Sequence, residues 1–311
     1  MSRLSEYTEL SEKEAVFENG EVKIDTKEDF DKYFEKLVNY DRVGTYIFRG
    51  SGEARYKLFT SAQRYWIEHQ LDKQGKHYHA FVKKLIKNCK DWNNKTIFTF
   101  FNRNGIDTNN ALAYLSYMQH YRVPTPLLDF TDSPYIGLFF ALEQGYSSSS
   151  DKEIDNYCSL YVVDTSSQYF YSTIQQFERD IGEQDVDEID YDQHLASFPV
   201  LLVTTENISY KIINNINISN QEGVFFYNNN PVMPIEEVYK QELGLIKESM
   251  GESAFQRHGY NEKFALCLNI HKNLRDYVLL KLLDHDVTPD FIYPNNKQLS
   301  AFSLKKTLED L

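Results

Sequence analysis

The sequence predicts a single α+β domain in which helices flank a mixed or antiparallel central sheet. Short runs of β-branched and aromatic residues are interspersed with longer stretches of helical periodicity, which predicts both kinds of element. No internal repeat and no sharp change in composition marks a second domain. A chain of 311 residues is within the range of large single domains. Its 23 tyrosines and 21 phenylalanines supply enough bulky side chain for a sizeable core.

The elements follow from local signals along the chain. We expect a tail or accessory helix at residues 1–24, the folded domain at 25–305 and a C-terminal tail at 306–311. The first regular helix begins at Thr26, which has Asp29 three residues on as in a capping box, and it ends before Gly44. Further helices are predicted at 63–92 with a polar interruption near 73–76, at 109–121, from 134, and at 274–283. Strands are predicted at 45–48, 127–131, 159–163, 201–203, 223–227 and 264–270, and an acidic, exposed insertion at 178–192.

Composition limits the partners and the compartment. The 33 Lys and Arg against 46 Asp and Glu give a formal charge of −13, which argues against non-specific binding to nucleic acid at long range. The three cysteines have neither disulfide-framework nor zinc-site spacing, so we expect no metal and a reducing compartment. Residues 1–21 contain no apolar stretch typical of a signal peptide, and no later run reaches membrane-spanning length. The sequence therefore indicates a cytoplasmic protein.

The residues whose side chains suit binding or catalysis occur in three separated blocks of the sequence. Arg49 follows a short strand and precedes Gly50, at a strand end where folds commonly place ligand-binding groups. In the second block a helix breaks at two prolines before the strand at 127–131, after which Ser133 and Pro134 are typical of a helix start. The third block precedes the strand at 223–227 and contains an amide, a carboxylate and a glycine in succession.

In this order the blocks resemble the FRG domain, a mainly prokaryotic and viral family. The resemblance covers residues 25–304, with two departures: Asn217 stands where relatives commonly have arginine, and Gly137 stands where alanine is usual. The matching segments are Phe48-Arg49-Gly50 with Arg64, Gln119-His120-Tyr121 through Thr125 to Thr131 and on to Phe139-Phe140-Ala141, Gln221-Glu222-Gly223-Val224-Phe225, and Tyr293-Pro294 near the end.

The layout of the blocks is in turn similar to that of ADP-ribosyltransferases. This similarity implies an ADP-ribosyltransferase-like fold, NAD as substrate, and either transfer to a protein or nucleic-acid target or simple NAD hydrolysis, in conflict between bacteria and phages. A planar, permanently charged guanidinium suits the NAD phosphates, and a carboxylate or amide dipole stabilises the oxocarbenium-like cation that forms when the nicotinamide bond breaks. The implied catalytic set is Arg49, Asp129, Gln221 and Glu222, and the implied substrate-binding set is Gly50, Arg64, Gln119, His120, Tyr121, Thr125 and Thr131.

Other interpretations of the same residues stay open. In the transferase layout a catalytic glutamate lies two residues after its Gln or Glu partner, and here that position is Gly223. Glu222 would point to the opposite face from Gln221 in a regular strand. A non-catalytic nucleotide-binding sensor or interaction module is therefore the alternative function. Arg49 is equally well explained as the partner of Asp129 in a buried ion pair, and Thr131 as a turn residue. The sequence sets neither the target nor the oligomeric state.

Overall fold

The computed structural model describes the chain apart from residues 1–3, 93, 107, 109, 144–150, 183–196, 204–220 and 294–311. Within this part, eight strands form one mixed sheet in the order β1-β8-β5-β3-β4-β7-β6, with β2 also paired to β8. The two N-terminal strands run parallel to β8 and the other neighbours are antiparallel, as the fold prediction allowed. The strands are β1 Phe17–Glu18, β2 Lys23–Ile24, β3 Tyr46–Ser51, β4 Leu127–Thr131, β5 Tyr157–Asp164, β6 Val200–Val203, β7 Gly223–Asn228 and β8 Ala265–His271.

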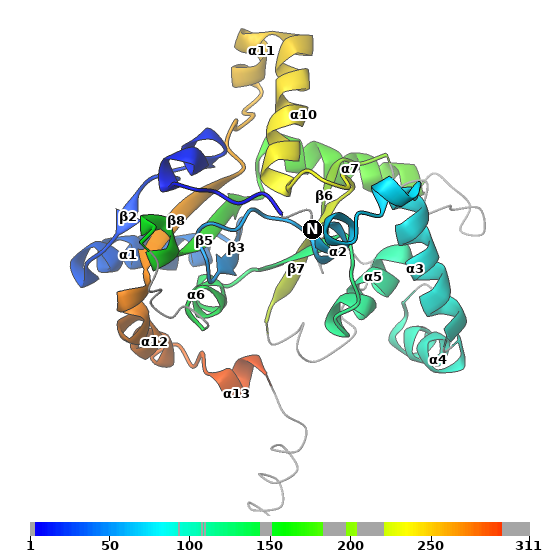
Figure 1. Ribbon diagram of the computed structural model, residues 1–311, viewed down its shortest axis with the longest axis horizontal. Helices are drawn as coiled ribbons and strands as arrows, with labels where there is room; N and C mark the ends of the chain where they lie inside the picture. Colours follow the sequence, from blue (N-terminus) through cyan, green and yellow to red (C-terminus); the bar gives the residue numbers. More distant parts are fainter. Residues whose placement is uncertain are drawn as a thin grey trace, which may run out of the picture.

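Helices cover both halves of this sheet (Figure 1). The helices α1 (Lys27–Val43), α6 (Pro134–Leu142) and α12 (Arg275–Leu283) pack together beside β3, β5 and β8. A second group packs beside β4, β7 and β6, whereas two consecutive helices project from the top of the view (Figure 1). The second group comprises α2 Ser61–Glu68, α3 Tyr78–Trp92, α4 Asn94–Asn104 and α5 Ala111–His120. The projecting pair is α10 Ile235–Met250 and α11 Glu252–Arg257. The other described α-helices are α7 Gln168–Gly182 and α13 Pro289–Ile292.

The junction between β3 and β4 divides the sheet. β3 pairs with β5 along its whole length, from Tyr46↔Asp164 to Ser51↔Ser159, and β4 pairs with β7 over all five of its residues. Between β3 and β4, however, the ladder holds a single pair, Phe48↔Thr131. The C-terminal half of β3 and the N-terminal half of β4 therefore separate, and we call this opening the seam.

Local signals placed several helices correctly. The side chain of Thr26 accepts a hydrogen bond from the Asp29 amide at 3.1 Å, and Gly44 ends α1 in the left-handed conformation at φ 70°. Pro134 is the first residue of α6, after the extended N-cap Ser133. These elements depend on contacts within a few residues, which explains why the sequence predicts them well.

Other elements differ from the expectation. β3 continues through Arg49 to Ser51, so Arg49 lies within the strand and not at its end. Neither α4 nor α10 was anticipated, although the buried Ile235, Val238, Tyr239 and Leu243 of α10 carry the helical spacing. The acidic stretch at 178–192 begins inside α7, and its residues from 183 onward lie outside the described part of the chain.

Residues 4–24 are packed into the domain and are no loose tail. They contain a 3-10 helix at Leu10–Ala15 as well as β1 and β2. Lys13 is fully buried, and its Nζ donates to Ser159 Oγ at 2.7 Å and to Asn269 Oδ1 at 2.8 Å. Two-residue strands leave almost no pattern in a sequence, and a buried lysine looks like a surface residue until its partners are known. For these reasons β1, β2 and the burial of Lys13 were not predicted, whereas the 3-10 helix agrees with the accessory helix that the sequence allowed.

Glu236, in the first turn of α10, makes stability depend on pH. It is fully buried, accepts from Tyr7 Oη at 2.9 Å and from the Leu58 amide at 3.2 Å, and burial raises its pKa from 4.5 to about 7. The folded state thus holds this proton more tightly than the unfolded state, so stability falls as pH rises from 4.5 towards 7. We expect Glu236→Gln, measured by denaturant unfolding, to remove about 3 kcal/mol of that decline. Parallel pH profiles for the two proteins would contradict this assignment.

Candidate functional site

A cavity of about 550 Å³ opens at the seam. Its walls come from β3, β4, α5, α6, the turn before β7 and Tyr293 at the end of α13. The volume is within the usual range of small-molecule sites. Six of the residues singled out from the sequence line it: Arg49, Gly50, Gln119, Asp129, Thr131 and Gln221. Residues from three distant segments therefore meet around one hollow.

Arg49 spans the seam. Its Nη1 donates to the backbone carbonyl oxygen of Asp129, so it contacts the main chain of β4 and forms no ion pair with the Asp129 carboxylate. Its guanidinium carbon lies 5.9 Å from the centre of the Phe130 ring. Burial lowers the pKa of Arg49 to about 10, with Asp129 opposing the shift, so the group stays cationic at neutral pH. Its Nε is closed off from solvent and has no hydrogen-bond partner in the described part of the chain.

Asp129 is held by a chain of polar contacts. Its Oδ2 accepts from Gln119 Nε2 at 2.9 Å, and Gln119 Oε1 accepts from the hydroxyl of Thr125. Thr125 is fixed in turn, because its amide donates to Ser61 Oγ at 3.0 Å. Gln119 therefore orients the carboxylate from inside the cavity, while Thr125 acts from behind it and does not line the wall. Asp129 itself stays exposed within an otherwise buried strand.

Gln221 and Glu222 lie in the turn before β7 and not in the strand, and their side chains separate there. Gln221 lines the cavity, and its Nε2 donates to the carbonyl oxygen of Ile292 at 3.2 Å. Glu222 adopts a left-handed φ of 46°, is exposed and lies outside the cavity, whereas Gly223 lines it. The two acidic and amide candidates of this block thus do not act in one place.

Gly50 has a packing role in addition to its place in the wall. A Cβ at this position would lie 2.2 Å from the Ala141 nitrogen and 2.2 Å from the Gly137 oxygen, both backbone atoms of α6. The absence of a side chain lets β3 and α6 approach closely. The expected reason for glycine here was the approach of a ligand; the structure shows the approach of a helix.

Arg64, Tyr121 and Thr131 differ in their relation to the cavity. Arg64 is close enough for its charge to lower the pKa of Arg49, yet it does not line the hollow. Tyr121 is 61% exposed and packs on Tyr117, with ring centres 4.8 Å apart. Thr131 lines the cavity but accepts from the Ser133 amide at 3.1 Å, which is the turn role that the sequence allowed. The side chain of His120 lies outside the described part of the structure.

Sequence reasoning missed further residues of the wall. Arg122 lines the cavity directly after α5, in a left-handed conformation at φ 59°, and Glu143 lines it at the end of α6. Tyr293 completes that side, and its hydroxyl donates to Glu143 Oε2 at 2.8 Å. A signal existed for Tyr293, since Tyr293-Pro294 belongs to the family resemblance. Arg122 was overlooked although it stands within the second block.

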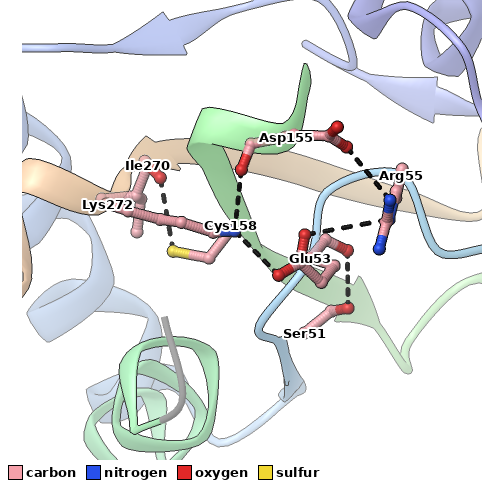
Figure 2. Close-up of polar contacts among 7 residues, drawn as sticks. All are labelled: Ser51, Glu53, Arg55, Asp155, Cys158, Ile270 and Lys272. Atoms are coloured by element: carbon pink, nitrogen blue, oxygen red, sulfur yellow. Dashed lines mark hydrogen bonds and ion pairs between the residues drawn. The ribbon is translucent and has the colours of Figure 1, made fainter. Parts of the chain in front are cut away.

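A polar cluster holds the chain that leaves β3 (Figure 2). The Nζ of Lys272, whose side chain is fully buried, donates to Glu53 Oε1 at 2.8 Å and to the Asp155 carbonyl oxygen at 2.8 Å. Arg55 reaches the carboxylate of Asp155 at 3.4 Å, and Ser51 Oγ donates to the Glu53 carbonyl oxygen at 3.0 Å. Figure 2 shows these groups converging where β3 ends. They anchor the segment that contains Gly52, which lines the cavity.

The described residues offer neither a cluster of metal ligands nor a membrane-spanning helix. They contain no group of three or more His, Cys, Asp or Glu that is able to hold a metal ion. They also contain no helix with the length and apolar character needed to cross a bilayer.

Comparison with known families identifies the region that supplies most of this wall. Residues 44–150 match the family model described as FRG domain. This chain contains an FRG domain. The match runs from the start of β3 past the end of α6, within the residues 25–305 that the sequence analysis assigned to the domain. It includes Arg49, Gln119 and Asp129, whereas Gln221 and Tyr293 join the FRG cavity from later in the chain.

No curated protein and no solved structure matches the chain. The likeness of the FRG fold to ADP-ribosyltransferases therefore stays a prediction.

Proposed function

We propose that this FRG-domain protein binds NAD in the seam cavity and breaks its nicotinamide–ribose bond, as an ADP-ribosyltransferase or an NAD glycohydrolase. One observation carries the proposal: Arg49, Gln119, Asp129 and Gln221, from separate parts of the chain, line a single cavity of ligand size. Folding alone does not require a cation, a carboxylate and two amides around one hollow.

Positive charge in the cavity supports an anionic ligand. The chain carries a formal charge of −13, whereas in the cavity wall Arg49 and Arg122 balance the two carboxylates Asp129 and Glu143. Nη1 anchors Arg49 to β4 and the residue lines the cavity, so its charge is fixed where a ligand phosphate would bind. The two guanidinium groups, those of Arg49 and Arg122, suit the two negatively charged phosphates of a pyrophosphate.

Asp129 is the carboxylate that suits the chemical step. Departure of nicotinamide leaves positive charge on the ribose, and a fixed carboxylate stabilises that charge as it develops. Gln119 holds Asp129 in one orientation, as electrostatic catalysis requires. Water or a nucleophilic group of a protein or nucleic-acid target would then attack the ribose. By the family resemblance, we place this activity in the bacterial cytoplasm, as a toxin or antiviral defence.

A specific observation favours the second candidate function, a non-catalytic sensor or interaction module that binds a nucleotide in the same cavity. Gly223 occupies the wall where the transferase layout has its glutamate, and Glu222 lies outside. Such a module would bind without turnover.

Incubation of the purified protein with NAD and candidate targets, including infected-cell lysate, tests the proposal. We expect nicotinamide release or ADP-ribose transfer that is lost in Arg49→Ala and kept in Arg257→Ala, an exposed residue of α11. Calorimetry with NAD, ADP-ribose and other nucleotides is run beside it. Tight binding without turnover supports the module. An absence of both binding and turnover would reject both functions.

A further inference from the structure

The cavity has a second carboxylate, Glu143, which no proposed step uses. It projects from the end of α6, whereas Asp129 projects from β4, so the two carboxylates belong to different walls. Glu143 Oε2 accepts from the Tyr293 hydroxyl at 2.8 Å. The Tyr293 ring lies 6.3 Å from that of Phe139 and 6.4 Å from that of Phe140, measured between ring centres. The carboxylate is thus oriented beside an aromatic wall.

The other oxygen of this carboxylate is open to a ligand. Oε1 has no hydrogen-bond partner among the residues that the structure describes. An ionised carboxylate only accepts hydrogen bonds, so its natural ligand partners are hydroxyl or N–H donors. In an adenine dinucleotide the vicinal hydroxyls of a ribose meet this need, and an acidic residue accepting from the ribose 2′-hydroxyl is a common way of recognising NAD. The neighbouring rings of Phe140 and Tyr293 supply an aromatic surface for the adjoining base.

Charge at this wall disfavours an additional phosphate. Glu143 directly follows α6, and its carboxylate is the negative charge of this wall, since the carbonyl oxygens of Leu142 and Glu143 at the helix end accept from Arg275 at 3.0 and 3.4 Å. A phosphate on the 2′-oxygen would remove the hydroxyl donor and bring a dianion against the carboxylate. Arg122 follows α5, and its charge reaches the Tyr293 hydroxyl, but among the described residues it forms no ion pair with Glu143, so it remains available to the bridging phosphates.

From this arrangement we infer that Glu143, oriented by Tyr293, accepts hydrogen bonds from the adenosine ribose of the dinucleotide and selects NAD over NADP. The inference rests on the proposed function and deepens it, because it names the ligand class that the cavity takes. Glu143 is a specificity-determining residue and takes no part in bond breaking.

Calorimetry with NAD and NADP at one ionic strength tests this inference. We expect the unaltered protein to bind NAD roughly tenfold or more tightly than NADP. In Glu143→Gln, NAD affinity should fall roughly tenfold and NADP affinity should rise, so that the ratio approaches one. Tyr293→Phe, which keeps the carboxylate, should weaken NAD binding while the preference for NAD persists. Glu248→Gln, an exposed position on α10, should change neither affinity.

The outcomes distinguish a failure of the role of Glu143 from a failure of the proposed function. Binding of NAD with an unchanged NAD to NADP ratio in Glu143→Gln would overturn the role of Glu143 alone. Equal affinity of the unaltered protein for both dinucleotides would do the same. No binding of either dinucleotide by the unaltered protein would overturn both the proposed function and the inference. Thermal unfolding of each variant shows whether a loss of affinity reflects a loss of fold.

Discussion

Replacing Asp129 by asparagine is expected to lower the rate of nicotinamide release about a hundredfold to a thousandfold. Asparagine keeps an oxygen that accepts from Gln119 Nε2, so the contact that orients the side chain is preserved while the negative charge is lost. Removing that charge takes away the stabilisation of the developing ribose cation. The measurement is turnover under saturating NAD, with affinity for NAD measured separately by calorimetry.

Glu222 offers the matched control. It is the carboxylate of the third block, one residue before the position that the transferase layout favours, and it is exposed and outside the cavity. We expect Glu222→Gln to keep its activity. Full activity of Asp129→Asn, or loss of activity in Glu222→Gln alone, would assign the chemistry to the third block and contradict the role of Asp129.

Replacing Gly50 by alanine is expected to destabilise the fold by about 3–5 kcal/mol, or to prevent recovery of folded protein. The added Cβ would lie 2.2 Å from two backbone atoms of α6, and backbone atoms cannot turn away as a flexible side chain can. Relief requires a shift between β3 and α6. Denaturant or thermal unfolding measures the loss.

Gly52→Ala is the control for this substitution. Both glycines line the cavity, but a Cβ at Gly52 meets only the Ala141 oxygen, at 3.9 Å, which is ordinary contact distance. Its stability should change little. If Gly50→Ala unfolds at the same denaturant concentration as the unaltered protein, the glycine is present for a ligand and not for the helix.

The candidate site was predictable as a set of residues but not as an arrangement. Arg49, Asp129 and Gln221 were chosen from the sequence as groups that should meet, and the structure places all three in the wall of one cavity. Their partners were not predictable: Arg49 reaches a carbonyl oxygen of β4, and Gln221 reaches that of Ile292. Main-chain acceptors leave no trace in a sequence, because every residue offers one.

The family blocks contain both residues that line the cavity and residues that do not. Gln119 and Thr125 match the same block, yet the first lines the cavity and the second holds the first from behind. Tyr121, from the same block, is exposed and packs on Tyr117. A motif marks residues that occur together; it does not say which of them faces a ligand.

By itself the sequence determined the local elements, the resemblance to the FRG domain and the candidate chemical groups. Helix caps, proline positions and hydrophobic periodicity act over a few residues, and β4 from Leu127 to Thr131 followed from them with its bounds correct. The tertiary structure decided that β3 and β4 part after one pair, and that Glu143 and Tyr293 close one side of the cavity. These features come from strand pairing and helix packing between distant segments, whose energies no local pattern records.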